Sequence, residues 1–317
     1  MSAGAGVAAV SSDIDTLLSN YKGIGCRRPG GYTKAELRMG LENFDRFLEP
    51  YGARATLFMV GHDFLHAPSH DAIRAVAARG HEIANHTMTH AQGFRLLPAA
   101  EKERELAGME AACLEVTGTR PVGFRSPGWN VGDDALPILR RRGYLYDSSV
   151  FPTTLMPLLK FLHWKTMSSR SPADRTTMGH GRYMLAPTAP YRTGTRTLGR
   201  RGTGGIVEFP ITVVPGARLP FFATWLVATG MDVFRASYRL LRAAGRPIQF
   251  MFHLSDFVDY GHPELADQVP RPGDGVYVPA ALGMPLKEKT ELFRRAMDVI
   301  AADHRFVTLR DWAGRVA

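Results

Sequence analysis

Cysteine is almost absent from this chain of 317 residues, which has only Cys26 and Cys113. Two cysteines are too few for a disulfide framework, and they lack the close spacing of a cysteine zinc site. The sequence therefore argues against a small disulfide-stabilised fold. We expect a cytoplasmic protein in a reducing compartment.

Long apolar runs and nucleotide-binding motifs are also lacking. Residues 1–10 are small and apolar but include no basic residue, so they lack the pattern of a signal peptide. The most apolar later run, residues 219–230, is uncharged but shorter than a membrane-spanning helix requires. No Gly-x-Gly-x-x-Gly or phosphate loop follows the first predicted strand. We therefore expect neither a transmembrane helix nor a nucleotide-binding sheet.

Acidic residues are scarce in one part of the chain. Residues 151–203 contain nine Lys or Arg and a single acid, Asp174, which accounts for nearly all of the net charge of +9. A basic surface favours an anionic partner: nucleic acid, a phosphate-bearing ligand or an acidic membrane. The alternative is a solvated loop that happens to be basic.

Short apolar segments alternate with amphipathic ones along the chain. Strands are predicted at 6–15, 55–60, 81–85, 121–124, 144–146, 206–211, 247–252 and 306–309. Helices are predicted before Gly52 and at about 69–79, 98–116, 133–142, 222–244 and 285–303. This alternation is typical of βα units around a parallel sheet, either a barrel or an open doubly wound sheet. Polar residues at the strand ends favour a (β/α) barrel. We predict one domain, 1–317, with a basic rim insertion at about 151–203.

Two histidines and two aspartates follow predicted strands. His86 and His90 are four residues apart, a spacing that would place both imidazoles on one face of a helical turn. Asp13 and Asp15 end the first strand and alternate along it. Two imidazoles and one carboxylate are the ligands of a catalytic zinc site with an open position. The second carboxylate would then be a general base. Surface histidines and loop-capping aspartates are the alternatives.

Three further polar residues stand at later strand ends. Arg125 precedes the turn-forming Pro127 and could hold a carboxylate in its ionised form. His253 follows three apolar residues and could protonate a leaving group. Asp147 could orient His253. A surface arginine, a core histidine and a turn aspartate are the corresponding structural alternatives.

In order, these motifs resemble those of the polysaccharide deacetylase family, the NodB-homology carbohydrate esterases. The resemblance covers roughly residues 5–315, apart from 151–203. Five segments carry it: Ser12-Asp13-Ile14-Asp15, His86-Thr87-Met88-Thr89-His90, Arg125-Ser126-Pro127, Tyr146-Asp147-Ser148-Ser149 and Phe252-His253. The family often has Tyr after the proline of the third motif, where this chain has Gly128. A backbone N–H is kept by that change, but an aromatic wall must come from elsewhere, for example from Trp129.

The resemblance implies a distorted (β/α) barrel of about seven to eight strands. It also implies a metal-dependent deacetylase that removes an acyl group, above all acetyl, from an amino sugar. Asp15, His86 and His90 would hold a divalent metal such as Zn²⁺, and Asp13 would be the base. Arg125 would keep Asp13 ionised, and Gly128 and Trp129 would contact the oxyanion and the substrate. His253, oriented by Asp147, would protonate the leaving amine.

Two other functions remain open. The first is a deformylase or an amidase of another small C–N amide. The branches of the family that separate the two acids by one residue, as this chain does, also act on formamides or small non-sugar amides. A non-catalytic module that binds saccharide or nucleic acid is the other, although the complete set of catalytic residue types argues against it.

Aromatic and basic residues of the predicted rim suggest a carrier for the sugar. Large apolar side chains occur in 151–164 and again in 219–226, close in sequence to the basic tract. Rings flanked by cations suit a membrane interface with anionic lipid. We therefore expect an N-acylated amino sugar or glycolipid as substrate, with peripheral contact to an anionic membrane. The alternative is that both runs pack on the barrel.

Overall fold

The computed structural model describes residues 6–17, 19, 34–166, 178–265 and 280–316. Their strands form one nine-stranded sheet in the order β6-β7-β5-β4-β3-β2-β1-β8, with β9 paired to β1. All pairs are parallel except β6 with β7. The strands are β1 (Gly6–Ile14), β2 (Ala55–Met59), β3 (Glu82–Asn85), β4 (Gly123–Phe124), β5 (Tyr146–Asp147), β6 (Tyr191–Arg192), β7 (Val207–Glu208), β8 (Ile248–His253) and β9 (His304–Phe306).

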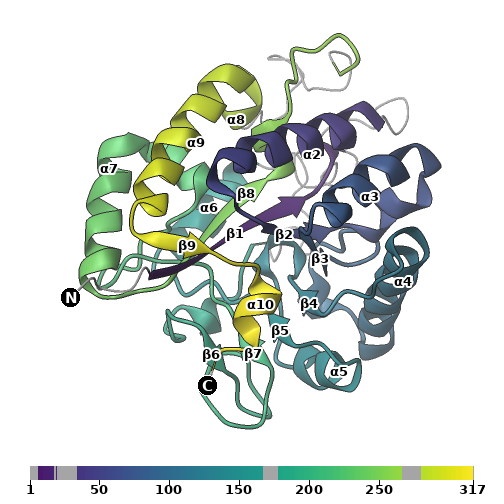
Figure 1. The fold of residues 1–317 in the computed structure, drawn as a ribbon. Helices are drawn as coiled ribbons and strands as arrows, with labels where there is room; N and C mark the ends of the chain where they lie inside the picture. Colours follow the sequence, from purple (N-terminus) through teal and green to yellow (C-terminus); the bar gives the residue numbers. More distant parts are fainter. Residues whose placement is uncertain (1–5, 18, 20–33, 167–177, 266–279, 317) are drawn as a thin grey trace.

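Helices surround the curled sheet, and Figure 1 shows α7, α9, α2, α3, α4 and α5 in succession around its outside. The predicted distorted (β/α) barrel is therefore confirmed. The described helices are α2 (Lys34–Leu48), α3 (His70–Ala78), α4 (Ala99–Thr117), α5 (Ala135–Arg141), α6 (Met156–Thr166), α7 (Ala223–Ala243), α8 (Ala280–Gly283), α9 (Leu286–Ala301) and α10 (Leu309–Ala313).

Strand β1 shows how the sheet separates its two faces. Ala8 and Val10 belong to the large cluster that packs under the outer helices. Ala9 belongs to a second cluster on the inner face, where Trp312 of α10 packs. Successive side chains of a strand point to opposite faces, so Asp13, four residues after Ala9, faces inward. The outer cluster thus stabilises the barrel while the inner face carries the polar groups.

The sheet is uneven, which explains why the barrel is distorted. Strand β1 has nine residues, whereas β4, β5, β6 and β7 have two each. In the half of the barrel formed by β4 to β7, side-chain packing takes the place of long runs of backbone hydrogen bonds between strands. A Cβ on Gly123 of β4 would lie 1.9 Å from the ring of Tyr146, which is fully buried and donates to Glu82 (2.8 Å).

The segment 151–203 contains a helix that its sequence did not predict. Its sequence has little periodicity, yet 156–166 form α6, and 191–192 add the antiparallel edge strand β6. Packing explains α6, because Met156 at its start is buried against Trp129 and Phe151. Residues 167–177 of this segment, like Cys26, lie outside the described part of the chain.

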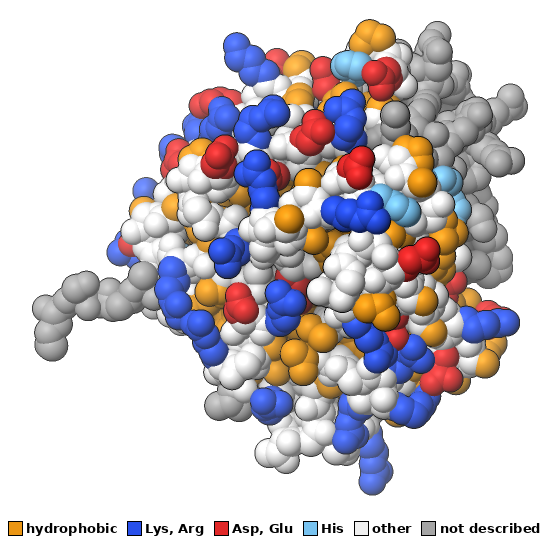
Figure 2. Space-filling model, turned by 45° about the vertical axis from the view of Figure 1, so that its right-hand side comes forward, with side chains coloured by type: hydrophobic (Ala, Val, Ile, Leu, Met, Phe, Trp, Pro, Cys, Tyr) orange, Lys and Arg blue, Asp and Glu red, His pale blue; other side chains and the backbone are white. Residues whose placement is uncertain are grey.

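The described residues include one of the two cysteines and most of the apolar segments of the chain. Cys113 is a buried free thiol in the outer core cluster. Among the described helices, none is both long enough and apolar enough to cross a bilayer. On the face drawn in Figure 2, Lys and Arg side chains are interspersed with acidic ones, so this face shows no continuous basic stripe of the kind that binds nucleic acid.

We expect Gly123→Ala to destabilise the fold by about 1–3 kcal/mol, because the new methyl group must displace the Tyr146 ring from a close-packed interior. The free energy of unfolding in urea measures this cost. Gly314→Ala is the matched control, since a Cβ there has open space around it. Equal stability of the two variants would contradict the packing argument.

Candidate metal centre and catalytic site

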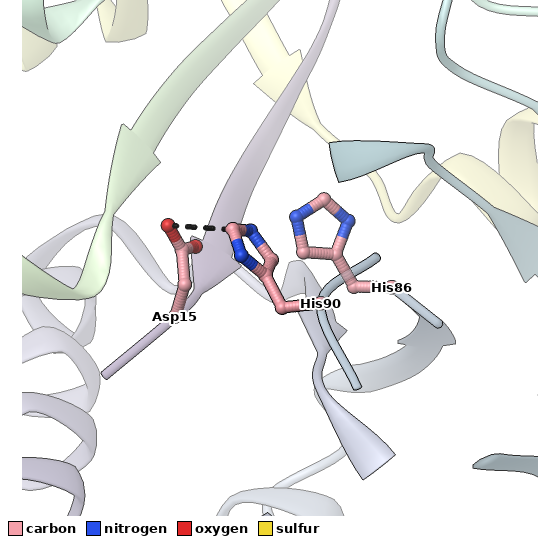
Figure 3. Close-up of side chains that lie close together, drawn as sticks. All are labelled: Asp15, His86 and His90. Atoms are coloured by element: carbon pink, nitrogen blue, oxygen red, sulfur yellow. Dashed lines mark ion pairs between the residues drawn. The ribbon is translucent and has the colours of Figure 1, made fainter. Parts of the chain in front are cut away.

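Three buried side chains, Asp15, His86 and His90, converge at the carboxyl ends of β1 and β3 (Figure 3). One donor atom from each lies within 4.8 Å of the other two. His90 Nε2 is 3.9 Å from Asp15 Oδ2, and the two imidazole centroids are 5.2 Å apart. Nitrogen and carboxylate oxygen donors at these separations can share one divalent cation.

The His86–His90 segment is a loop, so the predicted helical turn is wrong. Thr87 and His90 both have left-handed backbones, with φ of 68° and 54°. Asn85 accepts a hydrogen bond from the Thr87 N–H (2.7 Å), and the Thr87 carbonyl accepts one from the Gly61 N–H (2.9 Å). These bonds fix the turn, and the two left-handed residues bring the imidazoles together without a helix.

Backbone carbonyls orient both imidazoles. His86 Nδ1 lies 2.8 Å from the carbonyl oxygen of Arg125, and His90 Nδ1 lies 3.1 Å from that of Ser19. A carbonyl can only accept, so each ring donates from Nδ1 and turns Nε2 toward the other donors. This is the usual outer arrangement of a metal-binding histidine. The donor set therefore fits a divalent metal.

The charge state of His90 also suits a ligand. Burial lowers the pKa of His90 to about 4, while the adjacent Asp15 carboxylate partly opposes this shift. The imidazole is therefore neutral at neutral pH, which is the form that coordinates a metal.

A buried ion pair lies beside the three donors. Arg125 Nη1 is 2.5 Å from Asp13 Oδ1, and neither residue is more than 4% exposed. Arg125 Nε donates to the Ser148 carbonyl (3.0 Å), and the guanidinium lies 3.9 Å from the ring centroid of Phe58. A buried arginine fixed in this way pairs with the Asp13 carboxylate and orients it.

His253 stands next to Asp13 on the neighbouring strand. The two residues are register partners in the parallel pairing of β1 with β8, so their side chains point to the same face. His253 is partly exposed, and its Nδ1 lies 3.5 Å from Thr224 Oγ1. An acid–base pair on adjacent strands is thereby placed at one edge of the sheet.

The acid close to His253 is Asp256, which the sequence reasoning missed. Asp256 is buried, and its Oδ2 accepts from the His253 backbone N–H (2.9 Å). Burial raises the pKa of Asp256, while His253 and Lys289 oppose the rise. The carboxylate three residues after a strand-ending histidine was the available signal, because such an acid can cap the chain that leaves the strand.

Asp147 does not pair with His253, so this part of the prediction is wrong. Its Oδ1 accepts from Ser149 Oγ (2.6 Å), and its Oδ2 accepts from the Ser149 backbone N–H (3.2 Å). Burial raises the pKa of Asp147, and that of Glu208 is raised by burial and by Asp147. The next residue, Ser148, faces Arg125 (2.9 Å), so strand alternation turns Asp147 away from the catalytic face.

Gly128 and Trp129 form a tight turn, three residues after Arg125. Both have left-handed backbones, with φ of 59° and 56°. The Trp129 ring is largely buried and packs on Phe151 and Phe222, with centroids 5.0 and 5.8 Å away. Trp129 is therefore part of a buried hydrophobic cluster, and its role as the aromatic wall of the substrate site stays a prediction.

Comparison with known proteins agrees with these features. Residues 38–146 match the family model described as polysaccharide deacetylase. A peptidoglycan deacetylase-like protein of Gibberella zeae is 31% identical over 116 residues, which are 36% of this chain and 33% of that protein. A chitooligosaccharide deacetylase of Bradyrhizobium is 30% identical over 145 residues, 45% of this chain and 56% of that protein. The chain thus spans between one third and just over half of the lengths of these two relatives.

The fold similarity extends further than the sequence matches. A crystal structure of a Mycobacterium smegmatis protein assigned to the polysaccharide deacetylases superposes with a TM-score of 0.62 at 19% identity, covering 100% of this chain and 92% of that one. Residues 38–146 are thus similar in sequence to the polysaccharide deacetylases, and the likeness in fold extends over the rest of the chain.

Proposed function

We propose that this chain is a metal-dependent hydrolase that removes an N-acyl group, with acetyl as the main one, from an amino sugar. The observation that carries the proposal is the buried donor set of Asp15, His86 and His90 beside the Asp13–Arg125 ion pair. The names of the relatives, a chitooligosaccharide deacetylase among them, support an N-acetylated saccharide as the substrate class. Because the chain spans only part of those proteins, the activity itself remains the proposal.

The proposed reaction assigns a role to each polar group. A divalent ion held by Asp15, His86 and His90 would polarise the amide carbonyl and lower the pKa of the attacking water. Asp13, kept ionised by Arg125, takes a proton from that water as it adds to the carbonyl carbon. The C–N bond then breaks, and protonated His253 gives its proton to the leaving amine. The Gly128 N–H donates to the oxyanion.

Zinc is the metal we propose. Two imidazole nitrogens and one carboxylate leave a fourth tetrahedral position open for water or substrate, as in catalytic zinc sites. All three donors are buried, which suits a tightly held ion.

A lipid carrier for the sugar is a further part of the proposal, with the protein in peripheral contact with an anionic membrane. Leu158, Phe161 and Leu162 of α6 are each about half exposed. Their spacing of three and four residues places them on one helix face. Lys160 on the same helix is partly exposed, and apolar side chains beside a cation favour an anionic lipid surface.

We expect His86→Ala to weaken zinc binding at least about 100-fold, because it removes one of only three protein ligands. Elemental analysis after dialysis against a zinc buffer measures this. His304→Ala is the matched control and should keep its metal, because His304 lies in β9 beside Gly6, at the end of β1 opposite to Asp15. If both variants retain equal zinc, the metal is held elsewhere.

We expect Asp13→Asn to lower kcat/KM for N-acetylglucosamine oligomers by about 10²–10⁴, because the amide is isosteric but cannot take the proton. The assay is release of free amine, with and without a chelator. Asp232→Asn, a fully exposed acid of α7, is the control.

Asp13→Asn also leaves the Arg125 charge unpaired, so its circular dichroism must first show a folded protein. A folded Asp13→Asn variant with full activity, or activity that survives chelation, would overturn the mechanism.

We expect the protein to co-sediment with vesicles that contain phosphatidylglycerol and not with pure phosphatidylcholine vesicles. The paired change Phe161→Ser and Leu162→Ser should abolish this binding, since it removes most of the exposed apolar face of α6. Leu240→Ser, at an equally exposed leucine of α7, is the control. No sedimentation at low salt would leave a soluble saccharide as the substrate.

A further inference from the structure

Three basic residues belong to segments that meet next to the Gly128–Trp129 turn. Arg95 lies in the 3-10 helix Phe94–Leu96, and its backbone N–H donates to the Asn130 carbonyl (3.0 Å). The segment that contains His180 is joined to the turn by Gly179, whose N–H donates to the Gly128 carbonyl (2.6 Å). Lys160 lies on α6, whose first residue would contact a Cβ on Gly179. These segments are far apart in sequence, yet all of them lie against the same turn.

The pKa values of Lys160 and His180 are lowered by burial and by a shared neighbour, Arg95. Burial lowers the pKa of Lys160, and the charge of Arg95 adds to this shift. The pKa of His180 is also lowered, by burial first and then by Arg95, Lys160 and Arg182. Like charges placed together in partly buried positions destabilise the protein unless an anion neutralises them.

Two acids lie near Arg95, and both are committed to other donors: Asp134 is paired with Lys102. Asp133 accepts from Tyr183 Oη (2.8 Å) and the Leu198 N–H (2.9 Å), and it is paired with Arg182 Nη1 (2.9 Å). Within the described residues, neither Arg95 nor Lys160 forms an ion pair. The buried Nε of Arg95 has no hydrogen-bond partner there either.

We propose that Arg95, Lys160 and His180 form an anion subsite that binds a phosphate group on the sugar substrate. The inference rests on the proposed function, because the subsite adjoins the turn that would donate to the oxyanion. Guanidinium and ammonium groups are the usual partners of phosphate, and the guanidinium fork can bind two of its oxygens. The preferred substrate is then a phosphorylated N-acyl amino sugar rather than a neutral one.

The binding test uses inorganic phosphate and the metal-free full chain, so it does not depend on activity or on a metal. Calorimetric titration should show saturable phosphate binding. Arg95→Gln and Lys160→Gln should each weaken it about tenfold, which corresponds to about 1.4 kcal/mol. Arg239→Gln is the matched control, because Arg239 is an exposed arginine of α7. Failure of phosphate to bind, or equal binding by all variants, would overturn the subsite.

The selectivity test compares N-acetylglucosamine 1-phosphate with N-acetylglucosamine on the metal-loaded protein. The ratio of the two kcat/KM values should favour the phosphorylated sugar and fall about tenfold in Arg95→Gln but not in Arg239→Gln. A ratio that Arg95→Gln leaves unchanged contradicts the subsite. Phosphate binding without any deacylation would instead contradict the proposed function and leave the subsite standing.

Discussion

The buried ion pair between Arg125 and Asp13 is the interaction on which the site depends. The guanidinium is completely buried, and its partners come from three different strands or strand ends: Asp13 of β1, Phe58 of β2 and Ser148 after β5. Leaving such a charge without its partner costs about 3–5 kcal/mol, a large part of a typical folding free energy. The carbonyl of Arg125 also fixes His86 (2.8 Å). One residue therefore links Asp13, His86 and three neighbouring strands of the barrel.

Polar groups are held close to the metal ligands mainly by backbone geometry. Left-handed residues at Thr87 and His90 bring two imidazoles together, and those at Gly128 and Trp129 turn the chain back over the site. Such conformations are unfavourable for most residues and persist where the surroundings fix them. Here Asn85 and the Gly61 N–H hold the first turn, and Ser126 accepts from the Trp129 N–H (3.0 Å) in the second.

Much of the fold and part of the site could be predicted from the sequence. Apolar periodicity identified the long strands β1, β2 and β8 and the helices around them, because burial sets those patterns. The convergence of Asp15, His86 and His90 was predicted because strand ends meet at one edge of a parallel sheet. Asp147 was assigned the wrong partner, because sequence spacing does not reveal which face a two-residue strand turns inward. Helix α6 was missed because its packing partners are remote in sequence.

The uneven strand lengths divide the barrel into two halves with different tolerance of change. Asp13 and His253 come from strands of nine and six residues, whose ladders hold them rigidly in register. Trp129 and α6 belong to the half in which strands have two residues, where loops make up most of the chain. Insertions in that half disturb few ladder bonds. Side chains there can therefore change while Asp13 and His253 stay in place.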